Sequence, residues 1–235
     1  KTVRWFKKQQ GLATYPLVHT DAIQAAQYCD IHTQRLGVDL MTVSAAKIYG
    51  PKGIALLYVK EGTPINPLMF GGGQESGLRP GTENLPLIVG FTKALEIAEN
   101  MKESEVKRLQ ALQQYFFKKL ESVNVTAPLF IINGDLHERL PNNINISVPY
   151  ASGEQLVVEL DARGIMAAAQ SACTSHDEDE SYVVQALRPD ADAHIGSVRF
   201  TMGRGTTKKD IDYTIEKLST IVKKIKATYE KFGKK

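Results

Sequence analysis

Hydrophobic residues in the first sixty positions fall into short runs separated by polar or turn-forming residues. Three runs predict β-strands, at Tyr15 to Thr20, Val38 to Ser44 and Ile54 to Lys60, because each is rich in β-branched, aromatic or aliphatic side chains and is bounded by Asp, Gly or small residues. A helical pattern over residues 1–10 ends near Gly11. Strands separated by helical or irregular segments predict an α/β layer, in which ligands bind beyond the strand ends.

The spacing of hydrophobic residues becomes helical after a glycine loop at 71–73. From Leu85 to about Val123 they recur mostly every three or four positions, which predicts a long helical stretch linking two domains, with Ser104 as the place of any break. Beyond it we expect a strand at Asn143 to Val148, a helix at Glu154 to Arg163, a helix from Ser181, a strand at Val198 to Met202 and a final helix. Two helix starts carry capping pairs, Ser152 with Gln155 and Thr207 with Asp210.

The composition narrows the classes of protein. At 235 residues and 43% hydrophobic content, the chain is long enough for one large or two small domains. A net charge of +3 indicates no nucleic-acid partner, and no apolar run approaches the roughly 20 residues of a membrane span. Two cysteines are too few for a disulfide framework, which favours the reducing cytoplasm. The first residue is not methionine and lies within a helical pattern, so we expect the chain to begin inside a larger protein.

A lysine and a carboxylate follow two of the predicted strands. Lys47 comes just after the run ending at Ser44 and before a glycine-framed turn, where a lysine of lowered pKa can act as a nucleophile toward a carbonyl cofactor. Asp21 ends the preceding strand, where a carboxylate could pair with a pyridinium nitrogen. Each residue has a commoner role, since a turn lysine is usually a surface residue and an aspartate after a strand is more often a helix N-cap.

The set Asp21, Gln24, Ser44 and Lys47, at these spacings, resembles the cofactor segment of class V aminotransferase-fold enzymes, and most closely that of the cysteine desulfurases. Further motifs extend the resemblance over nearly the whole chain, in the family's order. They are Tyr15-Pro-Leu-Val-His-Thr-Asp-Ala, Lys47-Ile-Tyr-Gly-Pro-Lys-Gly, the glycine-rich segment 71–84, Leu140-Pro-Asn-Asn, Ser171-Ala-Cys-Thr and Val198-Arg-Phe-Thr-Met-Gly-Arg.

The resemblance implies a pyridoxal 5'-phosphate site. By it Lys47 would bind the cofactor covalently, Asp21 would contact the pyridine nitrogen, Gln24 the ring oxygen and Ser44 the phosphate. Thr82 would reach the phosphate of the other subunit, so a homodimer is expected. A threonine there can equally be the N-cap of the helix that begins near Leu85, and the two roles are compatible because a helix start attracts anions.

The resemblance also assigns the sulfur chemistry. Cys173 would take sulfur from the substrate and Arg199, expected to follow a strand, would bind the substrate carboxylate with its two parallel donors, with Arg204 as second choice. Without the resemblance, a lone cysteine such as Cys173 is more often inert. His176 could assist proton transfer or be a surface residue. Cys29 lies outside every motif and is expected to be a packing residue, and no metal site is expected.

The implied fold is part of the α/β pyridoxal-phosphate-dependent transferase fold, of the type I aspartate-aminotransferase-like class. Residues 1–100 would be the C-terminal part of the large domain, 101–123 a linking helix and 124–235 a small C-terminal α+β domain carrying the cysteine loop. The implied activity converts L-cysteine to L-alanine and passes sulfur, as a persulfide, to an acceptor protein such as an iron-sulfur scaffold or a tRNA-thiolation enzyme. A cytoplasmic protein without nucleic-acid or membrane partners is expected.

Other functions stay open at the level of sequence. The family has histidine before the cofactor lysine, as a phosphate ligand, whereas this chain has Ala46; Pro80 stands where serine is usual. Members of the family also carry a further N-terminal portion, roughly a third or more of their length. The alternatives are a selenocysteine lyase, a class V aminotransferase without sulfur chemistry, and an inactive truncated paralogue that serves as a binding protein.

Overall fold

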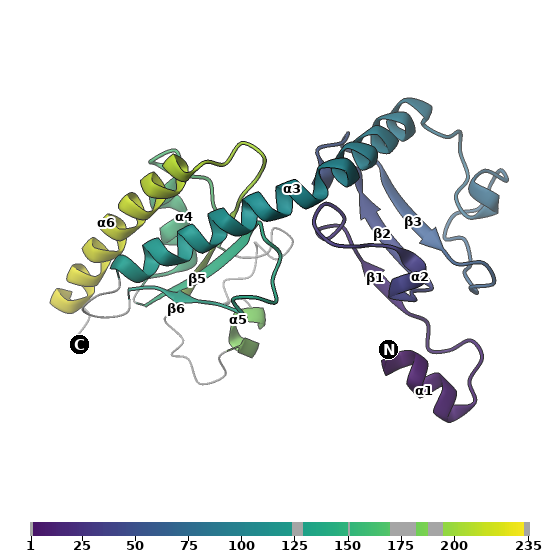
Figure 1. The fold of residues 1–235 in the computed structure, drawn as a ribbon, viewed down its shortest axis with the longest axis horizontal. Helices are drawn as coiled ribbons and strands as arrows, with labels where there is room; N and C mark the ends of the chain where they lie inside the picture. The colour runs from purple at the N-terminus through teal and green to yellow at the C-terminus, as the bar shows by residue number, and fades with distance from the viewer. Residues whose placement is uncertain (1, 124–128, 150, 170–181, 188–194, 233–235) are drawn as a thin grey trace. The chain divides into compact units, whose positions relative to one another are not determined.

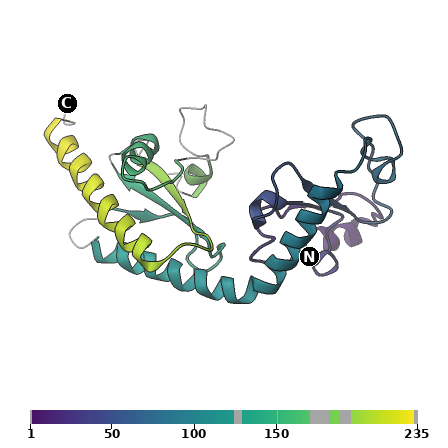
Figure 2. The ribbon, with the colours of Figure 1, turned by 90° about the horizontal axis from the view of Figure 1, so that it is seen from above.

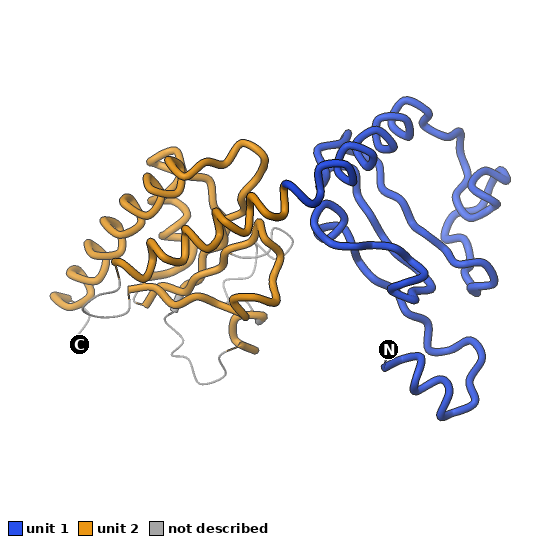
Figure 3. Tube along the Cα trace, in the orientation of Figure 1, with its two compact units in different colours: residues 1–104 blue, residues 105–235 orange. Residues whose placement is uncertain are grey.

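The computed structural model describes residues 2–123, 129–149, 151–169, 182–187 and 195–232. The chain divides into two compact units, residues 1–104 and 105–235 (Figure 3). The boundary falls inside the helix α3 (Leu85–Val123), which runs without interruption through Ser104, so the helix predicted from Leu85 to Val123 is confirmed and has no break. Which parts correspond to a large and a small domain stays a prediction.

The first unit is built on a three-stranded mixed sheet (Figure 1). Strand β1 (His19–Asp21) is parallel to β2 (Leu40–Ser44), and β2 is antiparallel to β3 (Ala55–Val59). The second and third predicted strands are confirmed in shorter form, whereas β1 shares only its first two residues with the predicted run and extends to Asp21. Parallel strands end at the same edge of a sheet, which brings the C-terminal ends of β1 and β2 together. The helices of this unit, apart from α3, are α1 (Thr2–Gln10), α2 (Thr33–Leu36) and the 3-10 turns η1 (Ala45–Ile48) and η2 (Glu75–Gly77).

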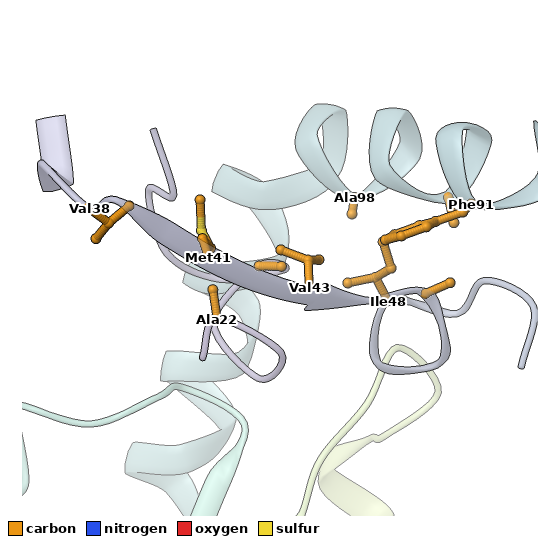
Figure 4. Close-up of a cluster of buried hydrophobic side chains, with 10 residues drawn as sticks. Ala22, Val38, Met41, Val43, Ile48, Phe91 and Ala98 are labelled. Carbon is orange, nitrogen blue, oxygen red and sulfur yellow. The ribbon is translucent and has the colours of Figure 1, made fainter. Parts of the chain in front are cut away.

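The core of the first unit lies between β2 and the first half of α3. Met41 and Val43 are buried on β2 while their neighbours are half-exposed, as the alternation of side chains along a strand requires. Figure 4 shows Phe91 and Ala98 of α3 on the side of β2 to which these two residues point. Leu40, Thr42 and Ser44 therefore lie on the opposite face of the sheet.

The second unit is an antiparallel sheet with helices packed against it. Strands β4 (Ile131–Ile132), β5 (Asn143–Pro149) and β6 (Ile195–Thr201) follow in that order, with α4 (Gly153–Asp161), α5 (Tyr182–Leu187) and α6 (Lys208–Phe232) as its helices. Tyr115 Oη donates a 2.8 Å hydrogen bond to Asp212 Oδ1, which joins the second half of α3 to α6 as Figure 2 shows. Phe116 and Phe200 meet with ring centroids 5.5 Å apart, so α3 also packs on β6.

Both predicted capping pairs are confirmed. Ser152 Oγ accepts a hydrogen bond from Gln155 N at 3.1 Å at the start of α4. Before α6, Asp210 Oδ2 accepts from Thr207 N at 2.8 Å and Thr207 Oγ1 accepts from Asp210 N at 3.4 Å. These bonds satisfy backbone donors that have no partner within a helix. No helix in the described part of the chain has the length and apolar character needed to cross a membrane.

Candidate active site

The ends of β1 and β2 bring three chemically different side chains to one edge of the first sheet. Asp21, the last residue of β1, is paired in register with Thr42, and β2 ends two residues later at Ser44. The turn η1 follows at once, with Lys47 as its third residue. A residue with a carboxylate and one with a hydroxyl thus end the two parallel strands, and one with an amine lies in the turn that follows; the ends of parallel strands are the usual ligand position in α/β sheets.

Each of these side chains is available to a ligand. Asp21 is exposed, and its Oδ1 accepts a 2.8 Å hydrogen bond from Ile23 N, which holds the carboxylate in place and leaves Oδ2 free of the described residues. Ser44 is half-buried, and its hydroxyl makes no capping bond to η1 although it occupies the N-cap position. Gln24 is exposed in the turn after β1. Lys47 is exposed and makes no ion pair with the residues that the structure describes.

The turn η1 has an inner and an outer side. Ala45 and Ile48 are fully buried, whereas Ala46 and Lys47 are exposed. Gly50 N donates a 2.8 Å hydrogen bond to Ala45 O, which closes the turn. The burial of the inner residues fixes the backbone and leaves the lysine on the outer side, whereas Ala46 beside it offers no hydrogen-bond donor on its side chain.

A histidine that no sequence argument had selected lies beside this site. His19 Nε2 and Thr42 Oγ1 are 2.9 Å apart and form a hydrogen bond between β1 and β2. His19 precedes Asp21 by two residues and Thr42 precedes Ser44 by two, so the bond joins the two strands on the face that carries the site. In the sequence, the only signal for His19 was its spacing of two residues from Asp21, which puts both side chains on one face of the strand. Its contact with Thr42 could not be predicted without knowing how the strands pair.

Thr82 lies in the segment before α3 and is exposed. The interpretation of Thr82 as the N-cap is wrong, because α3 begins at Leu85 and Asn84 caps it: Asn84 Oδ1 accepts a hydrogen bond from Leu87 N at 3.3 Å. Asn84 occupies the position next to the helix, where a short polar side chain reaches the free backbone donors. Thr82 is therefore not needed for the cap, and its hydroxyl is free for another role.

Arg199 lies within β6, not after a strand as expected, and pairs in register with Asn145. Its backbone N also donates to Ala168 O at 2.7 Å. Strand β6 begins at Ile195, before the predicted start at Val198. The second candidate, Arg204, lies near the buried Glu105 and helps to lower the pKa of that carboxyl, although the larger cause is the hydrogen bonding of Glu105 to Arg108.

Of the two cysteines, the structure describes Cys29 and not Cys173. Cys173 and His176 lie outside the described residues. Cys29 is a free, exposed cysteine, so its expected role in packing is wrong. It follows the turn after β1, where the buried side chains of the segment are those of Ala22, Ala26 and Gln27. Within the described ranges, no group of three or more His, Cys, Asp or Glu side chains is placed to hold a metal ion.

Comparison with known proteins assigns the chain to a family. Residues 9–214 match the family model described as aminotransferase class-V. The chain belongs to the class-V aminotransferase family. The resemblance stated from the sequence motifs is thereby confirmed, and the class-V match includes Asp21, Ser44 and Lys47.

Relatives of the class-V chain include enzymes named as cysteine desulfurases. The cysteine desulfurase IscS of Dictyoglomus turgidum is 41% identical over 208 residues, which are 88% of this chain and 52% of that protein. The cysteine desulfurase IscS of Haemophilus influenzae is 39% identical over 217 residues, 92% of this chain and 52% of the relative. The chain spans about half the length of the curated relatives it matches.

Solved structures show the same relationship. A NifS-like protein superposes with a TM-score of 0.79 at 31% identity, covering 94% of this chain and 55% of that structure. A NifS-like protein from Rickettsia africae also gives 0.79, at 26% identity and 93% and 56% coverage. The class-V chain therefore has about half of the α/β fold of these proteins, as the predicted partial fold required.

Proposed function

We propose that this chain carries the lysine, the sulfur-accepting cysteine and part of the cofactor-binding residues of a pyridoxal-phosphate-dependent cysteine desulfurase. The observation that supports the proposal is that the parallel strands β1 and β2 end at one edge of the sheet, with Asp21 and Ser44 as their last residues and Lys47 in the turn that follows. The relatives named as cysteine desulfurases support the choice of reaction within the class-V family. A cytoplasmic location agrees with this reaction and is proposed with it.

The residues present fit pyridoxal 5'-phosphate. An aromatic ring with a basic nitrogen requires a fixed carboxylate, which Asp21 supplies because Ile23 N holds one of its oxygens. The phosphate requires hydrogen-bond donors, and the Ser44 hydroxyl would be one of them. The side chain of Gln24 would donate to the ring oxygen. Lys47 supplies the amine for the covalent link. When bound, the cofactor supplies an electron sink for the bond changes at the substrate α-carbon.

The chain's own residues perform the remaining tasks in this mechanism. Lys47 Nζ would hold the cofactor and, as a free amine, would remove the α-proton of the substrate. Arg199 binds the substrate carboxylate through its guanidinium. The Cys173 thiolate attacks the substrate sulfur, the bond between that sulfur and its carbon breaks, and the sulfur remains on Cys173 as a persulfide while the carbon takes up a proton to give L-alanine. A sulfur-acceptor protein then removes the outer sulfur.

A second copy of the chain is part of this proposal, because Thr82 would reach the phosphate in the partner subunit. Large apolar side chains in the segment before Thr82 are almost fully exposed: Leu68 is 97% and Phe70 is 89% exposed. Leu85 and Val89 at the start of α3 are also exposed. Contiguous exposed apolar side chains favour association, so a second copy covering this segment agrees with the role given to Thr82. Sedimentation of the purified chain as a monomer would contradict it.

One alternative has an observation of its own. Ala46 removes a phosphate donor from the position beside the cofactor lysine, as expected in a paralogue that has lost catalysis and serves as a binding protein. Cofactor binding separates the two functions. A desulfurase requires pyridoxal phosphate on Lys47, whereas a binding protein does not.

The test is cofactor loading followed by turnover. We expect pyridoxal phosphate to give the absorbance of a lysine-bound cofactor, Lys47→Ala to remove it, and Lys52→Ala in the same exposed loop to retain it. With a thiol reductant present to reduce the persulfide, the release of alanine and sulfide from L-cysteine should stop in Cys173→Ser while the absorbance persists. Because Cys29 is exposed, thiol labelling of Cys173 needs a Cys29→Ala background. Loading without any release of alanine would favour the binding protein, and turnover after Cys173 is blocked would favour an aminotransferase without sulfur chemistry.

A further inference from the structure

The turn that carries Lys47 is packed against α3 so closely at Gly50 that no space is left for a side chain. A Cβ added at Gly50 would lie 2.9 Å from Ala94 Cβ of α3 and 3.0 Å from Ala45 O. Carbon atoms do not approach that closely without displacement, since packed interiors leave no such room. Gly50 is also the residue whose N–H closes η1 onto Ala45 O at 2.8 Å. The contact with α3 thus lies at the residue that shapes the lysine turn.

Neighbouring contacts hold the turn at the same place. Ile48 is buried in one cluster with Phe91 of α3, as Figure 4 shows. A Cβ added at Gly90 of α3 would lie 3.1 Å from Pro51 Cγ, so the residue after Gly50 is also close to the helix. Tyr49, between Ile48 and Gly50, has a left-handed φ of 63°, which reverses the chain and keeps Lys47 on the outer side.

We propose that Gly50 and Ala94 are positioning residues for Lys47. The close approach of these two residues sets the depth at which η1 sits on α3, and therefore the place of Lys47 Nζ relative to Asp21 and Ser44. A larger residue at either position moves the turn outward, because a buried helix in a packed core yields less than a surface turn. The proposal rests on the function proposed for Lys47, where a displacement of about 1 Å is enough to misplace a reacting group.

The test uses the full 235-residue chain in four variants: Gly50→Ala, Ala94→Gly, the two combined, and the control Gly205→Ala. A Cβ at Gly205 meets nothing within 4 Å. Two quantities are measured at Lys47. The first is the amount of pyridoxal phosphate fixed on Lys47 by borohydride, read by peptide mapping against Lys52. The second, without cofactor, is the pH midpoint for acylation of Lys47 by a small anhydride. Circular dichroism and thermal melting report folding.

We expect Gly50→Ala to lower cofactor fixation on Lys47 by about tenfold or more and to shift its acylation midpoint, with Lys52 unchanged. Ala94→Gly in the combined variant removes the nearest atom that the new Cβ would meet, Ala94 Cβ at 2.9 Å, but leaves Ala45 O at 3.0 Å and Ala45 Cβ at 3.1 Å. Fixation should therefore recover in part, to a value between those of Gly50→Ala and the parent chain. Gly205→Ala should match the parent. A purely structural contact would lower the melting temperature without moving either quantity at Lys47.

The proposal is overturned if folded Gly50→Ala fixes the cofactor and acylates as the parent does, or if the combined variant recovers its melting temperature but not its Lys47 chemistry. Should Gly50→Ala fail to fold, Gly90→Ala takes its place, because alanine favours the helix while its Cβ crowds Pro51. An unchanged Lys47 midpoint in that variant is then the contrary result. If the parent chain fixes no cofactor, the proposed function fails, and the cofactor-free midpoint still decides the role of Gly50 and Ala94.

Discussion

Asp21, the last residue of β1, is the register partner of Thr42 on β2. This pairing places the carboxylate of Asp21 on the face of the sheet opposite α3, beside the strand that ends in Ser44 and leads into Lys47. The hydrogen bond between His19 and Thr42 holds the two strands together one step before the site.

Replacing Asp21 with asparagine should separate cofactor binding from turnover. Asparagine keeps the size of the side chain and an oxygen for Ile23 N, but it removes the negative charge that would hold a proton on the ring nitrogen. We expect the lysine-bound absorbance to remain and alanine formation to fall by about two orders of magnitude. Spectra and turnover of Asp21→Asn are compared with those of the parent chain. Equal turnover would show that Asp21 does not act on the cofactor.

Introducing histidine at position 46 should strengthen phosphate binding. Ala46 is exposed beside Lys47, so a larger side chain meets no steric obstacle from the buried side of η1. A hydrogen bond to a charged group contributes about 1.5 to 3 kcal/mol, which corresponds to roughly a tenfold to hundredfold gain in affinity. Titration of Ala46→His with pyridoxal phosphate is compared with pyridoxal, which has no phosphate. A gain for both compounds alike would show that the histidine does not act on the phosphate.

Asn84 and Thr82 should have different effects on stability. Asn84→Ala removes the side-chain cap of α3 and is expected to cost about 1 kcal/mol of unfolding free energy. Thr82→Ala should leave the unfolding free energy nearly unchanged, since Thr82 is exposed and is not the cap, while it lowers cofactor affinity in the proposed dimer. Urea unfolding and cofactor titration of both variants measure the two effects. A loss of stability in Thr82→Ala equal to that in Asn84→Ala would contradict this separation.

Glu105 should make the stability of the second unit depend on pH. Its carboxylate accepts hydrogen bonds from Arg108 Nε at 2.9 Å and Nη2 at 2.7 Å, and Arg108 holds the pKa of Glu105 below its usual range. Because the folded pKa lies below the unfolded pKa, the stabilisation is complete above the unfolded value, about 4.3, and is lost as the pH falls through the folded value.

Glu105→Gln is therefore expected to lower the unfolding free energy by about 1 to 3 kcal/mol at pH 7 and by less at pH 3.5. Glu216→Gln is the matched control, since Glu216 lies in the same unit, its side chain is exposed and it pairs with Lys217, and exposed pairs contribute about 1 kcal/mol or less. Urea unfolding at both pH values measures the difference. A Glu105→Gln effect that does not shrink in acid would show that the charge of Glu105 is not its source.

The local parts of the site were predictable because they depend on neighbours in the chain. The run Val38 to Ser44, rich in β-branched and aliphatic residues, predicts β2, and the reciprocal pair Thr207 and Asp210 predicts the start of α6. The segment around Lys47 resembled the class-V family strongly enough to identify the fold. The short β4 and the turns η1 and η2 were missed, because two to four residues carry too little periodicity to be distinguished from a loop.

The sequence by itself determined the family and the order of the longer strands and helices, since both depend on motifs and on spacings of a few residues. Only the tertiary structure decided that Gly50 touches Ala94, that His19 bonds Thr42, that Asn84 and not Thr82 caps α3, and that Cys29 is exposed. These features depend on strand register, helix boundaries and the packing of segments up to about forty residues apart. Such contacts arise when hydrophobic faces pack together, and no local pattern specifies which side chains will then meet.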